Sequence, residues 1–277
     1  MTIDEIIENA IREDMGDGDH TSLSCIPKNV TGKVRLLIKD NGIIAGVEIA
    51  KKVFLKVDPE LKMTILLHDG AKISKGDIAF TVEGRSASIL SAERTALNFM
   101  QRMSGIATAT NELAEIVKGT KAKILDTRKT TPLLRELEKT AVRIGGGLNH
   151  RMGLYDMILI KDNHIDFSGG IEKAIRSTLE YLKNNKKNLK IEIEARNLQD
   201  VKEIMRIGGI HRIMLDNFTT EKLKEAVALI NSRFETEASG GINKENIRAY
   251  AETGVDYISV GAITHHFRSL DMSLKAV

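Results

Sequence analysis

Basic side chains are concentrated in one stretch of the sequence. Six of them lie between residues 128 and 161, namely Arg128, Lys129, Arg143, His150, Arg151 and Lys161. Guanidinium and ammonium groups at this density suit a ligand with several negative charges, since arginine binds carboxylates and phosphates in a bidentate manner. Lys161 follows the apolar run MILI, where a lysine is costly unless it faces an opening or an anion. The segment IGGGLNHRMG is a poor helix and a poor strand, which predicts a loop that passes close to something, such as a ligand.

Two carboxylates end later apolar runs. Glu194 ends KIEIE and Asp216 ends RIMLD. Such oxygens could hold Mg²⁺, directly or through water, or hydrogen-bond to ribose hydroxyls. Glu192 would share a strand face with Glu194, but it lies farther from the strand end, so Glu194 is the favoured ligand. No pair of histidines has the spacing of a metal site, and we expect no zinc centre and no metal role for His265 and His266.

Glycine turns follow the last two apolar runs. SGGI begins at Ser239 and VGAI begins at Val260. Glycine lets the backbone approach an anion, and a barrel often binds phosphate after its last strands. Ordinary turn chemistry is the alternative for either motif alone. The predicted phosphate contacts are Ser239, Gly240, Gly241, Val260, Gly261 and Ala262.

These residues fall at the ends of six expected strands. The runs AKILDT, YDMILIKD, KIEIEA, RIMLDN, FETEAS and YISVG are mostly separated by amphipathic helical patterns. Strands that alternate with helices predict a parallel sheet. Six or seven such units favour an incomplete α/β barrel, whose active site lies at the C-terminal ends of its strands. An open doubly wound sheet is the structural alternative.

The N-terminal part has a different pattern. Residues 1–20 predict a helix that ends near Gly16. Residues 32–90 predict a small antiparallel sheet with a helix near 48–57. Residues 91–117 predict one long helix with Ser91 as its N-cap. We therefore expect a small α+β domain over residues 1–108 and an α/β barrel domain over residues 109–277.

Composition excludes several classes of protein. The net charge is only +3 and tryptophan is absent, so a broad basic field or a stacking platform for nucleic acid is not expected. The sequence has no apolar run of the length of a membrane span and no signal-peptide pattern at its start. The single cysteine, Cys25, fits a reducing compartment, so we expect a cytoplasmic protein.

Taken in order, the motifs resemble one enzyme family. SAERTALNFMQRMSGIATAT, LDTRKTT, GGGLNHR, ILIKDNH, EIEA, IMLDN, EASGGI and ISVGAITH are similar to successive blocks of quinolinate phosphoribosyltransferases. The resemblance extends over nearly the whole chain. It implies an α/β N-terminal domain, an incomplete barrel and a homodimer or higher homo-oligomer in which the partner's N-terminal domain helps to close each site. It also implies transfer of phosphoribosyl from phosphoribosyl pyrophosphate to quinolinate, with decarboxylation and Mg²⁺.

The resemblance also implies roles for single residues. Arg94 would reach the substrate carboxylates across the dimer, and Glu194 and Asp216 would lie near the ribose and the metal. The catalytic set would be Lys129, Lys161, Glu194 and Asp216, and the other contacts to the two substrates would be Thr127, Arg128, His150, Arg151 and the phosphate-turn residues given above. The sequence departs from the family pattern at Thr140, at Ile144 and at the second histidine of THHF, all outside the charged set.

Three rival functions remain open at this point. A paralogous phosphoribosyltransferase-like protein of molybdenum uptake would share the fold, but we expect it to lack part of the cation set. Another phosphate-binding barrel, such as an aldolase, would not need the GGGLNHR segment. The run HDGAKISKGDIAFTVEG resembles biotinyl and lipoyl carriers, yet it has no lysine motif at a hairpin tip.

Overall fold

The computed structural model describes residues 2–277, and it divides into two compact units. The N-terminal unit comprises the chain up to Asn111, Thr130–Gly146 and Ile263–Val277. The barrel unit comprises Glu112–Lys129 and Gly147–Ala262. The units therefore follow packing, with two later segments of the chain folded into the N-terminal unit. None of the helices among residues 2–277 combines the length and apolar character that a membrane span needs.

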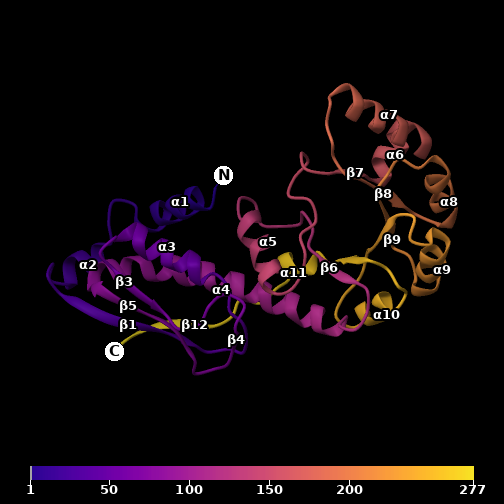
Figure 1. Cartoon of the computed structure of the whole chain (residues 1–277). Coiled ribbons are helices and arrows are strands. Elements are labelled where there is room, and N and C mark those ends of the chain that lie inside the picture. Colours follow the sequence, from indigo (N-terminus) through magenta and orange to yellow (C-terminus); the bar gives the residue numbers. More distant parts are fainter. Residues whose placement is uncertain (1) are drawn as a thin grey trace. The chain divides into compact units, whose positions relative to one another are not determined.

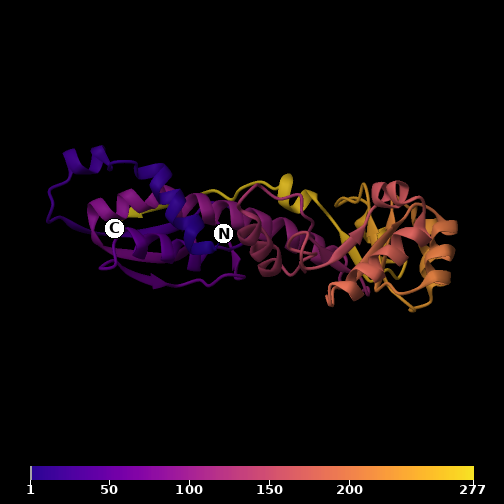
Figure 2. The same ribbon diagram turned by 90° about the horizontal axis from the view of Figure 1, so that it is seen from above.

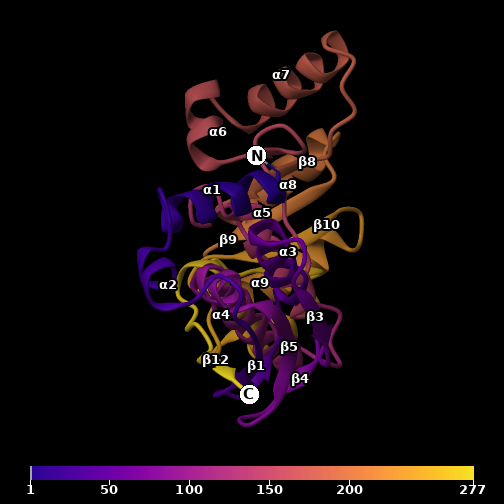
Figure 3. The same cartoon turned by 90° about the vertical axis from the view of Figure 1, so that its left-hand side faces the viewer.

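The N-terminal unit is built on an antiparallel sheet with strand order β12–β1–β5–β3. Helix α1 packs on α3, and Figure 3 shows both on the same side of this sheet. Its strands are β1 (Thr31–Ile38), β2 (Gly42–Ile43), β3 (Lys62–Ile65), β4 (Lys72–Ile73), β5 (Ile78–Arg85) and β12 (Met272–Ala276). Its helices are α1 (Ile3–Met15), α2 (His20–Cys25), α3 (Val47–Val57), α5 (Arg135–Ile144) and the first part of α4 (Ser86–Ile116).

Local chemistry explains where the first helix begins and ends. Thr2 and Glu5 form a capping box, in which each side chain accepts a hydrogen bond from the backbone of the other residue. Gly16 ends the helix at φ 52°, a left-handed conformation that favours glycine. The expected helix at residues 1–20, its end near Gly16 and the expected helix near 48–57 are confirmed.

Two expectations for this unit were incomplete or wrong. The long helix begins at Ser86, so Ser91 is not its N-cap, and the Ser91 hydroxyl instead donates to Asp19 Oδ2 at 3.0 Å. The C-terminal segment forms strand β12, which pairs with β1 in antiparallel register, for example Leu36 with Leu274. Figure 2 shows this yellow strand beside the indigo and purple strands of the N-terminal sheet.

The barrel unit contains six parallel strands in the order β6–β11–β10–β9–β8–β7. The strands are β6 (Lys123–Leu125), β7 (Ile158–Ile160), β8 (Ile191–Ala195), β9 (Arg212–Asp216), β10 (Glu235–Ser239) and β11 (Tyr257–Ser259). The helices are α6 (Asp162–Ser168), α7 (Ile171–Asn184), α8 (Leu198–Ile207), α9 (Thr220–Ile230) and α10 (Ile247–Ala251), and α11 (Ala262–His265) begins at the end of the unit. In Figure 1, helices α7, α8 and α9 cover the outer side of strands β8 and β9.

The strand order identifies the sheet as an incomplete barrel. Strand β6 pairs with β11, the last parallel strand, so chain order is cyclic around the sheet, whereas β6 and β7 do not pair. Beside β6 lies Leu148, which forms an isolated parallel bridge with Leu125. The predicted incomplete α/β barrel is confirmed, and an open doubly wound sheet is excluded because its first and last strands would not pair.

Candidate active site

The C-terminal ends of β7, β8 and β9 bring a lysine and two carboxylates to one edge of the barrel. Lys161 directly follows β7, and its Nζ lies 2.9 Å from Glu194 Oε1 on the neighbouring strand. The backbone N–H of Asp162 donates to Glu194 Oε2 at 3.0 Å. Both oxygens of the largely buried Glu194 therefore have partners, which fixes this side chain at the strand ends.

Asp216 ends the next strand and is half-buried. Burial, followed by the charge of Glu194, raises the pKa of its carboxyl, while a hydrogen bond from Ser239 and the charge of Lys161 oppose that rise. A carboxylate held against another carboxylate is an unfavourable arrangement that a cation relieves. The pair predicted from the sequence, Glu194 and Asp216, thus shares one electrostatic environment with Lys161.

A second group of cations lies at the end of β6. Asp126, which is fully buried, accepts a hydrogen bond from the backbone N–H of His150 at 2.8 Å. The next residue, Arg151, is only 9% exposed, and its Nη1 donates to the carbonyl of Met157 at 3.3 Å. Burial, followed by the positive charge of Arg128, lowers the pKa of Arg151. Two guanidinium groups that repel one another in this way form a strong site for an anion.

The loop after β6 carries the other predicted cations. Arg128 is half-buried and Lys129 is exposed. The Thr127 hydroxyl accepts a hydrogen bond from the Lys129 backbone at 3.0 Å, which shapes the turn. The predicted barrel residues Arg128, Arg151, Lys161, Glu194 and Asp216 thus interact through an ion pair or through their charges.

Glycine is structurally required in the turn after β10. Gly240 has φ 95° and Gly241 has φ 62°. A Cβ atom at Gly240 would lie 2.2 Å from Asn217 Oδ1, so no other residue fits without movement. After β11, the backbone N–H of Val260 donates to the Leu125 carbonyl, and Gly261 directly precedes α11, which begins at Ala262. The predicted phosphate turns therefore follow adjacent strands on the same edge as Asp216.

Comparison with known proteins assigns this arrangement to a family. The family model for the quinolinate phosphoribosyl transferase C-terminal domain matches residues 106–275, and the model for the N-terminal domain matches residues 19–104. The chain belongs to the quinolinate phosphoribosyl transferase family. The resemblance inferred from the sequence motifs is therefore confirmed.

Relatives of this family align with almost the entire chain. The chain is 47% identical to quinolinate phosphoribosyltransferase [decarboxylating] 1b of Nicotiana tabacum, over 98% of this chain and 81% of that protein. It is 39% identical to a probable nicotinate-nucleotide pyrophosphorylase [carboxylating] of Bacillus subtilis, over 99% and 93%. The crystal structure of NadC from Streptococcus pyogenes superposes with a TM-score of 0.94 at 37% identity, over 99% of this chain and 97% of that one.

Not every predicted cation belongs to the barrel unit. Arg94 lies on α4 and Arg143 lies on α5, and both are exposed residues of the N-terminal unit. Arg143 donates to the Thr140 hydroxyl at 3.2 Å. Arg94 forms no ion pair with any of residues 2–277. An exposed arginine of this kind remains available to a ligand or to another subunit.

The glycine-rich segment has a different role from the one suggested by its sequence. Gly145 follows the end of α5, and a Cβ atom there would lie 2.3 Å from the Ala107 carbonyl oxygen of α4. Gly146 has φ 92°. The close approach that requires glycine at residue 145 is therefore to a neighbouring helix of the same unit, and a ligand is not needed to explain it.

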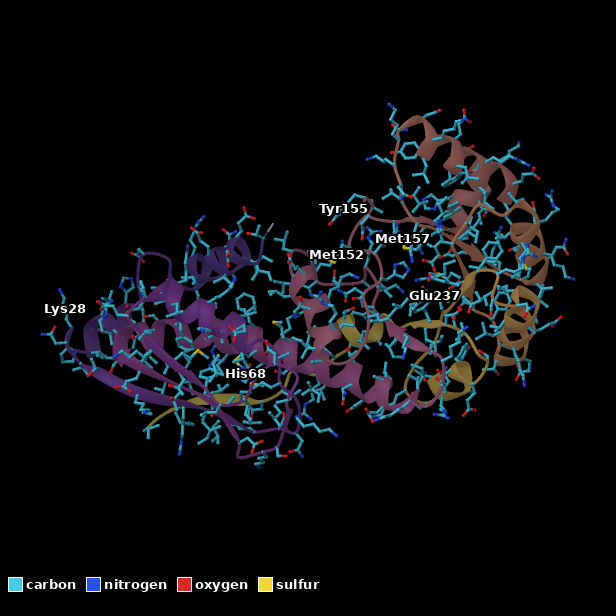
Figure 4. The ribbon with its side chains drawn as sticks, in the orientation of Figure 1. Lys28, His68, Met152, Tyr155, Met157 and Glu237 are labelled. Atoms are coloured by element: carbon cyan, nitrogen blue, oxygen red, sulfur yellow. The ribbon has the colours of Figure 1, made fainter. Side chains whose placement is uncertain are left out.

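Sequence reasoning set Glu192 aside in favour of Glu194 and missed Arg212 and Glu237 in the barrel interior. Glu192, Arg212 and Glu237 are buried on the inward faces of β8, β9 and β10. Figure 4 shows Glu237 in the interior of this unit and Tyr155 at the tip of the turn that contains Met152. The available signal was the alternation of these charges with apolar residues in strands, since period-2 spacing places them on the face of Glu194 and Asp216.

Proposed function

We propose that this protein transfers phosphoribosyl from phosphoribosyl pyrophosphate to quinolinate, releasing pyrophosphate and carbon dioxide and forming nicotinate mononucleotide in NAD biosynthesis. The observation that carries this proposal is the joint presence of the Arg128–Arg151 pair and the Lys161–Glu194–Asp216 cluster at the strand ends of a barrel of this family. As an enzyme, it would be a pentosyltransferase.

The charges of the substrates match those of the site. Quinolinate has two carboxylates, and phosphoribosyl pyrophosphate has several phosphate charges. Arg128 and Arg151 would hold the quinolinate carboxylates through bidentate contacts, with Thr127 and His150 in the same segment of the pocket. The turns from Ser239 to Gly241 and from Val260 to Ala262 would present backbone N–H groups to the 5′-phosphate.

The bond changes explain why both signs of charge are needed. The pyridine nitrogen of quinolinate attacks C1 of the ribose, and the bond from C1 to pyrophosphate breaks. Positive charge develops on the ribose ring, where Glu194 and Asp216 would stabilise it, and negative charge develops on pyrophosphate, where Lys129 and Lys161 would stabilise it. These four residues are the proposed catalytic groups.

Decarboxylation follows from the product of that attack. The new pyridinium nitrogen withdraws electrons from the adjacent ring carbon, so the carboxylate on that carbon leaves as carbon dioxide. The electron pair left on carbon is stabilised by the pyridinium and then takes up a proton. The nitrogen of the substrate itself therefore serves as the electron sink, and no covalent enzyme intermediate is required.

The carboxylates fit Mg²⁺ mainly through water. Both oxygens of Glu194 already accept hydrogen bonds from Lys161 and Asp162, which leaves little room for direct coordination. The pKa of Asp216 is raised by burial and by Glu194, an arrangement that a nearby cation would relieve. We therefore propose that both carboxylates hold Mg²⁺ through water, and that the ion, when bound, neutralises pyrophosphate charge.

We also propose a homodimer or higher homo-oligomer in which Arg94 of one subunit completes the site of another. The exposed, unpaired Arg94 side chain supports this arrangement. Arg94→Ala and Lys161→Ala should each lose most of their activity alone. After subunit exchange, a mixture should recover about a quarter of native activity, since about half of the dimers are mixed and each has one intact site of two. A mixture that stays inactive after demonstrated exchange would place Arg94 in its own subunit's site.

A cytoplasmic location is proposed on chemical grounds. The only cysteine, Cys25, is free and exposed, which suits a reducing compartment. Immunofluorescence or fractionation of the protein in its own cells would test this, and enrichment in an organelle or outside the cell would contradict it.

A product assay tests the proposed reaction. The protein is incubated with phosphoribosyl pyrophosphate, Mg²⁺ and either quinolinate or nicotinate, and the nucleotide product is identified by mass spectrometry. Nicotinate mononucleotide should form from quinolinate, and nicotinate should be a poor substrate because it has only one carboxylate. Equal turnover of nicotinate would contradict the two-carboxylate site, and full activity with excess chelator would contradict the Mg²⁺ proposal.

A further inference from the structure

A chain of buried polar contacts lies beneath the strand-end residues of the barrel unit. Arg212 Nη1 is 2.9 Å from Glu237 Oε2 and 4.0 Å from Glu192 Oε2. The same guanidinium contacts Glu235 at 3.1 Å and lies over the Tyr257 ring, 4.1 Å from its centroid. Glu192 and Glu237 have no exposed surface. Such a layer is unusual because barrel interiors are mostly filled by branched aliphatic side chains.

The contacts end on His150, whose two ring nitrogens have different partners. Nε2 lies 2.9 Å from Glu192 Oε2 and 3.5 Å from Glu237 Oε2. Nδ1 accepts a hydrogen bond from the backbone N–H of Arg151 at 2.7 Å. A nitrogen that accepts carries a lone pair, so the proton of a neutral imidazole must be on Nε2, the ring nitrogen that lies near the Glu192 carboxylate. The Nδ1 contact therefore selects one tautomer, and the nearby carboxylate is compatible with it.

This arrangement leaves the imidazole oriented toward protein groups. The backbone N–H of His150 donates to Asp126, its Nδ1 accepts from the backbone of Arg151, and its Nε2 lies 2.9 Å from Glu192 Oε2. The position of the His150 ring affects Arg151. The guanidinium of Arg151 is buried, and the charge of Arg128 helps to lower its pKa. A displacement of the ring would move the Arg151 backbone directly.

We propose that His150 is a positioning residue, held as its neutral Nε2–H tautomer by the Arg212–Glu237–Glu192 network, and that its Nδ1 fixes Arg151 for substrate binding. This inference rests on the proposed function, in which Arg151 binds a carboxylate of quinolinate. It differs from the role implied by the family resemblance, in which His150 lines the pocket as a ligand.

The same residues could also be considered as a metal site. Ligand atoms of His150, Glu192 and Glu237 all lie within 4.8 Å of one another. However, Arg212 already places a cation 2.9 Å from Glu237, and a divalent ion would be repelled by it. Burial, followed by the charge of Glu192, also raises the pKa of Glu237 to about 8, so a neutral carboxyl group next to Glu192 reduces the need for a second cation.

Two substitutions of His150 separate a positioning role from a ligand role. In His150→Asn, the amide oxygen takes the place of Nδ1 and can still accept from Arg151. In His150→Gln, the amide nitrogen takes the place of Nε2. A positioning role predicts that the Asn variant retains at least about tenfold more kcat/KM for quinolinate than the Gln variant, the scale on which supporting partners matter. A ligand that acts through Nε2 predicts the opposite order, which would overturn the inference.

The network gives a second comparison with a conservative rescue. Glu237→Gln keeps the shape of the side chain, an acceptor for Arg212 and a donor for Glu192, whereas Glu237→Ala keeps none of these. The Ala variant should raise KM for quinolinate about tenfold or more, and the Gln variant should recover most of that loss. Equal KM values for the Ala variant and the native protein would also overturn the inference.

His211 supplies a matched control in the same unit. Its Nδ1 accepts from the backbone N–H of Ile191 at 3.0 Å, at the N-terminal ends of the strands. His211→Asn and His211→Gln should both leave the kinetics unchanged, which shows that the ranking at His150 is not a general effect of replacing a histidine.

Nitrogen-15 spectra of the histidine side chains test the tautomer without catalysis. The His150 signals should report a neutral Nε2–H ring at neutral pH, and quinolinate alone should leave that state unchanged. An imidazolium, or a change of protonation on adding quinolinate, would contradict the positioning role. If no nicotinate mononucleotide forms while the spectra show the Nε2–H tautomer, the proposed reaction fails and the network stands. If the reaction occurs with the wrong variant order, the inference alone fails.

Discussion

The strands of the two units bury different side chains, although both interiors are mostly apolar. The N-terminal unit buries Leu36 of β1, Phe54 of α3 and Phe80 of β5, and the two rings pack edge to face with centroids 6.1 Å apart. The barrel unit turns Arg212 and Glu237 inward at comparable depth. Apolar side chains stabilise by burial itself, while buried charges are costly unless they are paired. The comparison indicates that the apolar side chains around the N-terminal sheet serve stability, whereas the buried charges of the barrel strands also support the charged edge above them.

The largest expected difference between the units concerns activity. Each unit has a short lysine–carboxylate pair, Lys161–Glu194 at 2.9 Å in the barrel and Lys52–Asp4 at 2.7 Å on the surface of the N-terminal unit. Lys161→Ala should cost about 2–5 kcal/mol of transition-state stabilisation, roughly 30- to 5000-fold in kcat/KM, because an anion is left unpaired. Lys52→Ala should change kcat/KM less than about twofold. Similar losses of kcat/KM in steady-state assays of the two variants would contradict the proposed difference between the two lysine–carboxylate pairs.

The second comparison concerns stability. Arg212→Ala should lower the free energy of unfolding by about 3–5 kcal/mol because the buried Glu192 carboxylate and the Glu237 carboxyl group lose the guanidinium that they contact. Leu36→Ala should cost about 2–5 kcal/mol through lost burial and a cavity. The mechanisms differ in how they can be repaired. Replacing Arg212 by Met together with Glu192 and Glu237 by Leu should recover much of the first loss, since apolar packing can substitute for a buried set of charges.

Urea unfolding followed by hydrogen exchange in each unit would measure these changes. The Arg212 effect should appear in β8, β9 and β10, and the Leu36 effect should appear in β1 and β5. If Arg212→Ala unfolds at the same urea concentration as the native protein, Arg212 does not stabilise the buried carboxyl groups.

The third and smallest comparison is the dependence of stability on pH. In the N-terminal unit, the Arg85 hydrogen bond to the buried Asp58 carboxylate, 2.7 Å long, holds the pKa of Asp58 well below its usual value. In the barrel unit, burial raises the pKa of Glu237 to about 8. Asp58 therefore stabilises the folded state above its unfolded pKa of about 3.9, and this contribution is lost as the pH falls. Glu237 contributes most below about pH 4.3, and its contribution is lost as the pH rises through about 8.

Neutral variants isolate these two contributions. The difference in unfolding free energy between the native protein and Asp58→Asn should shrink as the medium becomes acidic. Glu237→Gln should gain stability relative to the native protein as the pH rises from about 6 to about 9, because it cannot ionise. If the unfolding free energies of Asp58→Asn and Glu237→Gln both follow that of the native protein across the pH range, the two carboxyl groups do not differ in the proposed way.

Some of this contrast could be predicted from the sequence, and some could not. Helix α3, the six barrel strands and the residues at their ends followed from local periodicity and from glycine turns. Strand β12 could not be predicted in this way, because its pairing partner is β1 at the other end of the chain. The cap at Ser91 was wrong since the helical pattern continues upstream to Ser86.

The site was predicted unevenly for a similar reason. Strand-end residues such as Lys161 and Asp216 could be assigned because a parallel barrel gathers its strand ends. The contacts of His150 could not, since they depend on which side chains face inward from three strands and on the path of the segment after Gly147. Gly145 was linked to a ligand because the sequence does not reveal that α4 lies against it.

The most direct test of the proposed function follows the carbon that leaves. Quinolinate labelled with carbon-13 in the carboxylate next to the ring nitrogen is incubated with phosphoribosyl pyrophosphate, Mg²⁺ and the protein, and labelled carbon dioxide and nucleotide are measured together. The proposed reaction predicts equal amounts of labelled carbon dioxide and unlabelled nicotinate mononucleotide. Lys161→Ala should form both products more slowly, and by the same factor. A nucleotide that retains the label, or no nucleotide at all, would contradict the assignment of this site to decarboxylating phosphoribosyl transfer.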